Sequence, residues 1–415
     1  MRHAPLLAER TTRPLRVLLL LGNWIGGGAE RVAVHLMHAL PAHWDVRLGL
    51  LHAGDAWLDE LDPARVMLAA HGAERFRYDR PNAELFDAAT LVNGALHAPR
   101  AFRTMIAATR PDVVLSFLKG TAILTWLALA GLRQRPRWIA REGNNILATA
   151  RAESPGALVR RASLGLTGRA YRRADAVLTN ARAMARDMAA QFRIDPARLH
   201  TIPNPVDLER IARAVHSAPP HRPPRPYLLT AGRLEIQKGQ DLLLTAFAAS
   251  QAARSHDLVI LGQGSLAAKL RNMAQSLGVG HAVHFVGFAE NPYSWMAGTD
   301  LFVLPSRWEG FPNAAAEAMA AGAPVLLADC DYGPRELVGP AQRDVLFPVG
   351  DSAALAAGID RMIAAPSLRA ANATAGQLRV KRFAIDQMVA RYTALIAEVA
   401  NERAPSTAPL TLAAA

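Results

Sequence analysis

Short apolar runs alternate with longer helical patterns along most of this chain. In the first half the apolar runs lie at 15–21, 46–51, 113–117, 138–140, 176–179 and 199–202. In the second half they lie at 227–231, 257–261, 283–286, 301–304 and 324–328. Strands that are buried on both faces read as uniformly apolar runs of this length. The pattern therefore predicts an α/β protein with parallel sheets and crossover helices.

Two domains are expected from the length of 415 residues, because one hydrophobic core rarely serves so long a chain. Residues 216–226 are proline-rich and poorly suited to a helix or a sheet. The boundary is placed just before them, which gives domains at 1–205 and 206–382. Ligands of such domains bind where the strands end, in a cleft between the two sheets. The Ala/Pro/Thr-rich tail at 403–415 is expected to be disordered.

Composition places the chain among ordinary globular proteins, with 51% apolar and 20% charged residues. Its single cysteine, Cys330, has no internal partner for a disulfide, which fits a reducing compartment. The apolar run 15–21 ends in Gly-Asn-Trp and is read as a buried strand rather than a secretion signal. The stretch 121–132 is shorter than the ~18 residues that span a bilayer. We expect a cytoplasmic protein, free or on the inner face of the membrane.

The net charge of +12 has two interpretations, one without a functional role and one that implies a partner. It can reflect GC-rich coding and solubility, or attraction to anionic lipid headgroups or a lipid-diphosphate acceptor. Nucleic acid is not an expected partner, because no basic-aromatic module is present. Residues 155–173 form a basic amphipathic segment that suits either a membrane interface or a solvated helix. Its arginines are Arg160, Arg161, Arg169, Arg172 and Arg173.

The segment 306–325, SRWEGFPNAAAEAMAAGAPV, carries most of the chemical information. Glu309 and Glu317 stand eight positions apart around a turn that opens a helix. Asn313 is the expected cap, the alanine-rich run to Ala321 favours helix, and Gly322 closes it. The helix N-terminus suits an anion such as a diphosphate. Two carboxylates beside this anion site are expected to accept hydrogen bonds from hydroxyl groups on both sides of the anion.

This segment resembles the E-x7-E signature of retaining glycosyltransferases of family 4, which have the GT-B fold. Further motifs in matching order are Gly26-Gly27-Gly28-Ala29-Glu30-Arg31, Ile202-Pro203-Asn204-Pro205-Val206-Asp207, Ala231-Gly232-Arg233-Leu234 with Lys238-Gly239, Leu261-Gly262-Gln263-Gly264 and Phe285-Val286-Gly287-Phe288. The resemblance implies two Rossmann-like domains facing across a cleft. It also implies a last helix, about 383–402, that crosses back onto the first domain.

The resemblance assigns roles to four residues of the second domain. Arg233 and Lys238 match residues that bind the diphosphate of the donor, and cations there stabilise the leaving group as its charge develops. Two solvated surface cations are the alternative. Glu317 would bind the ribose of the nucleotide, and Glu309 the transferred sugar. An ordinary helix-surface glutamate is the alternative for Glu317.

Backbone groups are also expected to contact the donor. Phe311, Pro312 and Asn313 lie where N–H groups could hold phosphate or sugar oxygens. Gly262 and Gly264 either let the nucleotide approach the backbone or form a plain tight turn. In the first domain, three consecutive glycines suggest close approach of another molecule, so Gly27 and Gly28 are assigned to diphosphate binding or acceptor positioning.

The first domain departs from the family at residues 141–145. Many members carry a histidine here, whereas this chain has Arg141-Glu142-Gly143-Asn144-Asn145. The segment is similar to that of members acting on lipid-linked or lipopolysaccharide acceptors. Glu142 is the candidate for an acceptor-facing carboxylate, and a structural salt bridge near Arg141 is the alternative.

No metal site is expected. Asp329-Cys330-Asp331 has the D-x-D form of another glycosyltransferase fold, but it follows a strand and precedes a helix start. Arg233, Lys238 and two helix termini already supply positive charge.

Together these features predict a glycosyltransferase that moves a hexose or N-acetylhexosamine from a UDP- or GDP-linked donor to a lipid-linked saccharide. The family resemblance implies that the anomeric configuration is retained. No other cofactor is expected. The rivals are a GT-B nucleotide-sugar epimerase or hydrolase, and an inactive basic scaffold of the same fold.

Overall fold

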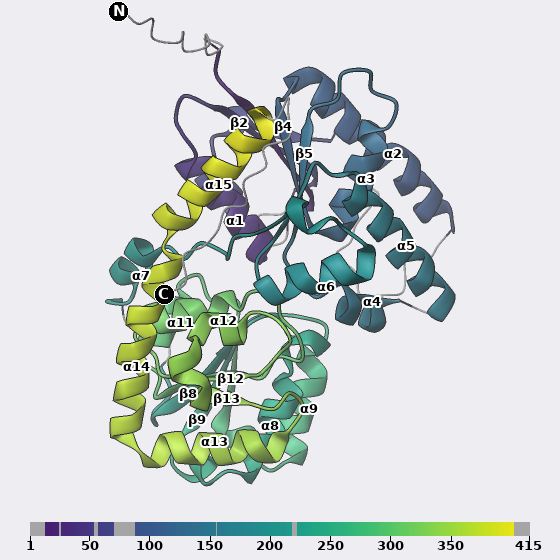
Figure 1. Ribbon diagram of the computed structural model, residues 1–415. Helices are drawn as coiled ribbons and strands as arrows, with labels where there is room; N and C mark the ends of the chain where they lie inside the picture. The colour runs from purple at the N-terminus through teal and green to yellow at the C-terminus, as the bar shows by residue number, and fades with distance from the viewer. Residues whose placement is uncertain are drawn as a thin grey trace, which may run out of the picture.

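The computed structural model describes residues 13–24, 26–53, 57–69, 88–154, 156–217 and 222–401. The tail at 403–415 and Pro155 lie outside the described residues. Two lobes, each a sheet with helices on both faces, are stacked one above the other (Figure 1). None of the helices in these ranges is both long and apolar enough to cross a bilayer.

Seven parallel strands form the first sheet, in the order β3-β2-β1-β4-β5-β6-β7. Their bounds are β1 (Arg16–Asn23), β2 (Asp45–His52), β3 (Val66–Leu68), β4 (Val113–Phe117), β5 (Arg137–Glu142), β6 (Ala176–Thr179) and β7 (Leu199–Thr201). The helices of this domain are α1 (Gly28–Ala39), α2 (Ala88–Thr109), α3 (Leu118–Leu129), α4 (Ile146–Glu153), α5 (Ala157–Arg173) and α6 (Arg182–Phe192). Short 3-10 turns are η1 (Leu58–Glu60), η2 (Pro63–Arg65) and η3 (Pro196–Arg198).

Six parallel strands form the second sheet, in the order β10-β9-β8-β11-β12-β13. Their bounds are β8 (Tyr227–Ala231), β9 (Asp257–Leu261), β10 (Val283–Gly287), β11 (Leu301–Leu304), β12 (Val325–Ala328) and β13 (Leu346–Phe347). The helices are α7 (Leu208–Ala214), α8 (Gln240–Ala249), α9 (Ala267–Ser276), α10 (Pro292–Ala297), α11 (Asn313–Ala320), α12 (Pro334–Val338), α13 (Ser352–Ala364), α14 (Pro366–Val380) and α15 (Ile385–Asn401). The 3-10 turns are η4 (Ile236–Lys238), η5 (Gln251–Arg254), η6 (Gly280–Ala282), η7 (Pro340–Val345) and η8 (Lys381–Phe383).

The central strands are buried on both faces, which explains their uniformly apolar sequences. Along β1, Leu19 and Leu21 belong to the core on one side of the sheet, and Leu18 and Leu20 to the core on the other. All five residues of β9 are buried. The predicted α/β class with two parallel sheets is confirmed. The short edge strands β3 and β13 were not predicted from the sequence.

The last helix crosses back to the first domain, as the family resemblance implied (Figure 1). Helix α15 packs on α1 and β5, and its apolar side chains complete one core of the first sheet. The two chain crossings between the domains lie side by side. The N–H of Val206 donates to the carbonyl of Phe383 at 2.8 Å, and the N–H of Ile385 donates to the carbonyl of Val206 at 3.1 Å.

A buried arginine joins these crossings to both domains. Arg141, at the end of β5, is only 1% exposed. Its Nε donates to the hydroxyl of Tyr392 on α15 at 2.8 Å, and its Nη2 donates to Oδ1 of Asn204 at 2.5 Å. Asn204 in turn donates to Oδ1 of Asn313 at the start of α11, at 2.8 Å. The polar chain therefore runs from the last helix through the first sheet to the second domain.

Removing the hydroxyl of Tyr392 tests this polar chain. Tyr392→Phe leaves the buried Nε–H of Arg141 without its acceptor, which costs about 1–3 kcal/mol. We expect the thermal unfolding midpoint to fall by about 2 °C or more. Tyr293→Phe is the matched control, since no hydrogen bond of its hydroxyl occurs within the described ranges. Equal midpoints for the two variants would show that the Arg141 contact contributes nothing.

Candidate active site

Lys238 and Glu309 meet at the carboxyl edge of the second sheet. Lys238 ends η4, which follows β8, and Glu309 lies in the loop after β11. Their Nζ and Oε1 atoms are 2.6 Å apart, and the hydroxyl of Ser306 donates to the same Oε1 at 2.7 Å. The Glu309 side chain is 5% exposed and that of Lys238 is 20% exposed. The structure thus brings two predicted site residues together, and each neutralises the charge of the other.

Arg233 lies in the same loop but is exposed. Its guanidinium makes one long contact, from Nη2 to Oε1 of Gln237 at 3.4 Å. Gln237 also donates to the carbonyl of Trp308 at 3.0 Å and to Oδ1 of Asn144 in the first domain at 3.3 Å. The loop that carries Arg233 and Lys238 therefore touches the first domain at its 142–145 loop.

Glu317 differs from Glu309 in having no ionic or hydrogen-bonding partner within the described ranges. Its half-buried carboxylate makes no hydrogen bond to any residue that the structure describes. Burial raises its pKa to about 7, against the opposing fields of Arg31 and Arg210. A carboxylate of this kind, set on the first turns of a helix, is available to accept hydrogen bonds from a ligand.

The expected capping role of Asn313 is wrong. Pro312 occupies the cap position, no side chain caps the helix, and Asn313 is the first helical residue. Its amide is used across the domain interface, because Oδ1 accepts from Asn204 and Nδ2 lies against Gly28. A Cβ at Gly28 would stand 2.3 Å from that Nδ2, so a side chain there would require the Asn313 amide to move.

The contact between Gly28 and Asn313 brings two helix N-termini together. Helix α1 begins at Gly28 with Gly27 as its cap, and α11 begins at Asn313. The N–H groups and positive dipole ends of both helices favour an anion at this place. The side chain of Phe311 packs at 5.3 Å on the ring of Phe383, and Pro312 is buried. The side chains of these two residues are therefore not available to a ligand, and contact through their backbone stays a prediction.

Gly262 and Gly264 lie beside another loop of the protein. A Cβ at Gly262 would stand 2.0 Å from the carbonyl oxygen of Gly232, and one at Gly264 would stand 2.5 Å from that of Leu234. Gly262 also has a φ of +128°, which disfavours any side chain. Close packing of the two loops accounts for both glycines, and their contact with a nucleotide stays a prediction.

Glu142 is held inside the first domain. It is 2% exposed; its Oε1 accepts from the N–H groups of Gly143 and Asn144, at 2.8 and 2.9 Å, and its Oε2 accepts from the hydroxyl of Tyr171 at 2.7 Å. Burial raises its pKa. This carboxylate shapes the 142–145 loop, and its contact with an acceptor stays a prediction. No salt bridge of Glu142 occurs among the described residues, and Arg141 bonds to Tyr392 and Asn204 instead.

Sequence reasoning missed a charged cluster that spans the domains. Glu60 of the first domain pairs with Arg31 of α1 at 2.9 Å and with Arg210 of α7 at 3.0 Å. Arg31 was part of the glycine-rich motif, but its position in the sequence did not predict partners elsewhere in the chain.

In the segment 329–331, Asp329 pairs through both oxygens with Arg335.

Two glycosyltransferase families match the chain, one for each domain. Residues 26–210 match Glycosyltransferase Family 4, and residues 213–379 match Glycosyl transferases group 1. The chain belongs to these glycosyltransferases.

Several curated relatives of this glycosyltransferase have functional names. The N-acetylgalactosamine-N,N'-diacetylbacillosaminyl-diphospho-undecaprenol 4-alpha-N-acetylgalactosaminyltransferase of Campylobacter jejuni is 30% identical over 51% of this chain, and the match spans 57% of that protein. The lipopolysaccharide core biosynthesis glycosyltransferase LpsE of Rhizobium meliloti is 24% identical over 89% of this chain and 96% of its own.

Among solved structures, HepE of Anabaena in complex with UDP-glucose superposes with a TM-score of 0.72. The likeness covers 92% of this chain and all of that one, at 19% identity. At this identity the likeness concerns the fold alone, and it confirms the expected GT-B fold of this glycosyltransferase.

Replacing Glu317 in this glycosyltransferase tests its electrostatic environment without any ligand. Its folded pKa of about 7 lies above the ordinary 4.5, so between these values the folded protein holds a proton that the unfolded chain has lost. Stability therefore falls as pH rises through this window, and the penalty is complete above pH 7. We expect Glu317→Gln to be about 1–3 kcal/mol more stable than wild type at pH 8, with no difference at pH 4.

Thermal unfolding across that pH range measures the difference. The matched control is Glu209→Gln, whose side chain is 90% exposed, and it should show no such trend. A pH-independent effect of Glu317→Gln would contradict a raised pKa for this carboxyl.

Proposed function

We propose that this glycosyltransferase moves a hexose or N-acetylhexosamine from a UDP- or GDP-linked donor to a lipid-linked saccharide. The reaction would contribute to the biosynthesis of lipopolysaccharide or another cell-surface polysaccharide. One observation carries the proposal: the N-termini of α1 and α11 lie with Lys238 and Glu317 along the edge where the two domains meet, and Glu317 has no partner in the part of the chain that the structure describes. Such an edge suits a diphosphate flanked by hydroxyl groups.

The relatives support the substrate classes in this proposal. The name of the Campylobacter jejuni protein describes transfer of N-acetylgalactosamine to a sugar on diphospho-undecaprenol. LpsE is named for the lipopolysaccharide core, and HepE was solved with UDP-glucose. The HepE title names a nucleotide-sugar, and the Campylobacter jejuni name gives a saccharide acceptor.

The proposed roles follow from where each side chain lies. Arg233 and Lys238 bind the diphosphate, assisted by the N–H groups at Gly27, Gly28 and the start of α11. This requires Lys238 to turn from Glu309 to the phosphate, which leaves Glu309 able to accept from hydroxyls of the sugar. Glu317 accepts from the ribose. Fixed cations stabilise the leaving diphosphate as the bond to the sugar breaks.

Retention is proposed through attack on the same face of the sugar. The acceptor oxygen bonds to the anomeric carbon as the bond from that carbon to the phosphate oxygen breaks, and the hydroxyl proton passes to the departing phosphate. In the proposed roles Glu309 accepts from hydroxyls of the sugar, and Glu142 is enclosed in the first domain, so neither is assigned as a covalent nucleophile. The proposed mechanism has no enzyme-bound sugar.

A donor panel tests the proposal directly. We expect UDP or GDP, but not ADP, to raise the thermal midpoint. Turnover with a lipid-diphosphate-sugar acceptor should identify the transferred sugar.

Glu317→Ala should weaken nucleotide binding by about 1–3 kcal/mol and reduce transfer, because a hydrogen bond to ribose is lost.

Transfer should survive excess EDTA, since Arg233 and Lys238 supply the positive charge.

The rivals give different results in the same panel. An inactive scaffold would show no midpoint shift with any nucleotide. A hydrolase or an epimerase would consume or convert the donor without an acceptor. Loss of transfer in EDTA that Mg²⁺ or Mn²⁺ restores would refute metal independence.

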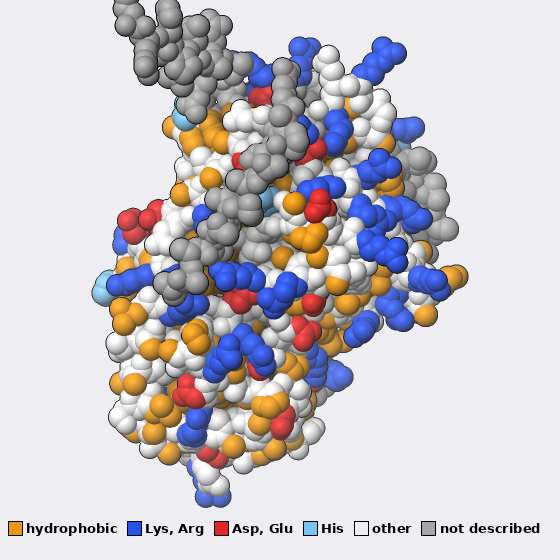
Figure 2. All heavy atoms as spheres, in the orientation of Figure 1, with side chains coloured by type: hydrophobic (Ala, Val, Ile, Leu, Met, Phe, Trp, Pro, Cys, Tyr) orange, Lys and Arg blue, Asp and Glu red, His pale blue; other side chains and the backbone are white. Residues whose placement is uncertain are grey.

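A membrane surface is the proposed location of the acceptor, and α5 is its proposed contact. Lys and Arg side chains gather on the flank of the first domain where α5 lies (Figure 2). Leu158 at the start of α5 is 83% exposed, and Val159 and Leu166 are 44% and 43% exposed. Apolar tips among arginines suit an anionic interface.

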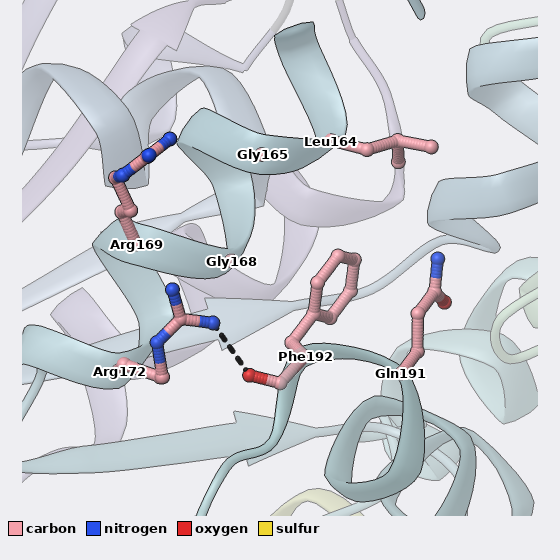
Figure 3. Close-up of a pocket in the computed structure, with 7 residues that line it drawn as sticks. All are labelled: Leu164, Gly165, Gly168, Arg169, Arg172, Gln191 and Phe192. Atoms are coloured by element: carbon pink, nitrogen blue, oxygen red, sulfur yellow. Dashed lines mark hydrogen bonds between the residues drawn. The ribbon is translucent and has the colours of Figure 1, made fainter. Parts of the chain in front are cut away.

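A groove between α5 and α6 adds a place for a headgroup on this flank. It has a volume of about 340 Å³ and is lined by Arg169, Arg172 and Phe192 among other residues (Figure 3). Gly168 lets Phe192 approach α5, because a Cβ there would stand 2.9 Å from the ring. Arg172 donates to the carbonyl of Phe192 at 2.7 Å, whereas Arg169 extends from the next turn of α5.

Co-sedimentation with vesicles that contain anionic lipid tests the membrane contact. Each basic side chain near such a surface contributes about 1 kcal/mol, and salt weakens the attraction. We expect binding at low salt and release when the five arginines of α5 are replaced by glutamine. The five are Arg160, Arg161, Arg169, Arg172 and Arg173.

A charge-matched control separates location from net charge. Replacing five exposed cations of the second domain with glutamine removes the same charge and should leave binding to the vesicles intact. They are Arg213, Lys269, Arg343, Lys381 and Arg382. Equal release by both sets, or no binding by wild type at low salt, would overturn the assignment to α5.

A further inference from the structure

The residues that precede Glu309 are tied to the first domain through one amide side chain. The carbonyl of Trp308 accepts from Nε2 of Gln237 at 3.0 Å, and the same Nε2 donates to Oδ1 of Asn144 at 3.3 Å. The carbonyl of Gln237 also accepts from the N–H of Arg307 at 2.8 Å. Asn144 of the first domain is therefore separated from the loop that carries Glu309 by a single bridging side chain.

The residue that follows Glu309 meets the same loop of the first domain directly. A Cβ at Gly310 would stand 2.0 Å from the carbonyl oxygen of Gly143, so a side chain there would require the backbone to move. Nδ2 of Asn180 donates to that carbonyl at 3.1 Å and so helps to fix its direction. The 142–145 loop thus contacts the chain on both sides of Glu309, through a bridging amide on one side and by close approach on the other.

Glu142 fixes the conformation of the 142–145 loop. Its Oε1 accepts from the N–H groups of Gly143 and Asn144 at 2.8 and 2.9 Å, and its Oε2 accepts from the hydroxyl of Tyr171 at 2.7 Å. Hydrogen bonds to a carboxylate are stronger than those between neutral groups, and burial strengthens them further. The two N–H groups that Glu142 holds belong to the same two residues that contact the second domain.

We propose that Glu142 is a positioning residue for sugar transfer. It holds Gly143 and Asn144 against the chain on both sides of Glu309, and thereby sets the place of the Glu309 carboxylate relative to the first domain. The inference rests on the proposed function, in which Glu309 accepts from hydroxyls of the transferred sugar. It implies that Glu309 is correctly placed only while the two domains are docked.

Direct action of Glu142 on the acceptor is the alternative, and the two roles require different things of its side chain. Positioning needs an oxygen that accepts from the two N–H groups, whereas a general base for an acceptor hydroxyl needs a carboxylate. Glu142→Gln keeps such an oxygen, and its NH₂ group can donate to the hydroxyl of Tyr171. Glu142→Met keeps a similar volume but offers the loop no strong acceptor.

Backbone hydrogen exchange tests the positioning without any ligand. We expect Glu142→Met to raise the exchange rate of the segment 306–311, in the second domain, by about tenfold or more, and Glu142→Gln to leave it within about twofold of wild type. Asp175→Leu is the matched control, because Asp175 is a 9% exposed carboxylate at the opposite end of the first sheet that accepts from the N–H of Trp138 at 2.8 Å. It should lower the thermal midpoint and leave exchange at 306–311 unchanged.

Steady-state transfer, with the donor and acceptor that the panel identifies, tests the consequence for the reaction. Glu142→Met should lower kcat by about tenfold or more, because a misplaced sugar contact slows the chemical step, while KM for the acceptor stays within about twofold. The affinity for UDP or GDP alone should also stay within about twofold, because the nucleotide is assigned to other residues. Glu142→Gln should retain the kcat of wild type.

Asn144→Ala is a second variant, and it decides the matter if Glu142→Met does not fold. It removes the acceptor for Gln237 and leaves the bonds of Glu142 to the backbone in place. It should raise exchange at 306–311 and lower kcat, each by less than Glu142→Met does. Combined with Glu142→Met it should add less than its separate effect, because both changes release the same contact.

The outcomes separate this inference from the proposed function. Unchanged exchange at 306–311 in Glu142→Met, or in Asn144→Ala if only that variant folds, overturns the inference whether or not transfer is observed. Equal loss of transfer in Glu142→Gln and Glu142→Met, or a raised KM for the acceptor with unchanged kcat, also overturns it, because Glu142 would then act on the acceptor. If exchange rises in Glu142→Met but wild type binds no nucleotide and transfers no sugar, the coupling of Glu142 to the segment 306–311 stands and the proposed function fails.

Discussion

The buried guanidinium of Arg141 is the interaction on which the arrangement of the two domains depends. A charge removed from water is costly unless its N–H groups are well bonded, and no carboxylate among the described residues pairs with this one. Its partners are the neutral oxygens of Tyr392 and Asn204, and its charge lies 5.2 Å from the ring centre of Phe117. Each partner belongs to a different part of the chain, so satisfying one arginine brings β5, α15 and the inter-domain crossing together.

The placement of the candidate site follows from that constraint. The side chain of Asn204 donates a hydrogen bond to Asn313, and the Asn313 amide lies against Gly28 at the start of α1. The backbones also approach closely next to this chain of contacts, since a Cβ at Gly310 would stand 2.0 Å from the carbonyl oxygen of Gly143. The helix that carries Glu317 is therefore positioned by polar contacts with the first domain as well as by the core of its own domain.

Local sequence signals sufficed for the sheets and for one part of the site. Buried parallel strands are uniformly apolar, so their positions were found to within a few residues, apart from the short edge strands β3 and β13. Lys238 and Glu309 each follow a strand end, and strands β8 and β11 are neighbours, which brings the two side chains together. The remaining errors concern partners that no spacing encodes. Asn313 is of a residue type that often caps helices, but its side chain bonds across the interface. Glu60 pairs with Arg210, 150 positions away. Glycines are ambiguous for another reason, because Gly262 looks the same in sequence whether it makes room for a ligand or for a backbone carbonyl.

The return of α15 to the first domain has a consequence for how the chain folds during synthesis. The second domain is contiguous, so its two cores are complete once the ribosome has made residues up to about Phe383. One core of the first domain lacks Met388, Tyr392 and Val399 until the last helix emerges, although most of that domain was made first. Domains usually fold in the order of their synthesis. In this protein the domain that begins first is the last to be completed, and its unfinished apolar face must stay protected while the other half of the chain is translated.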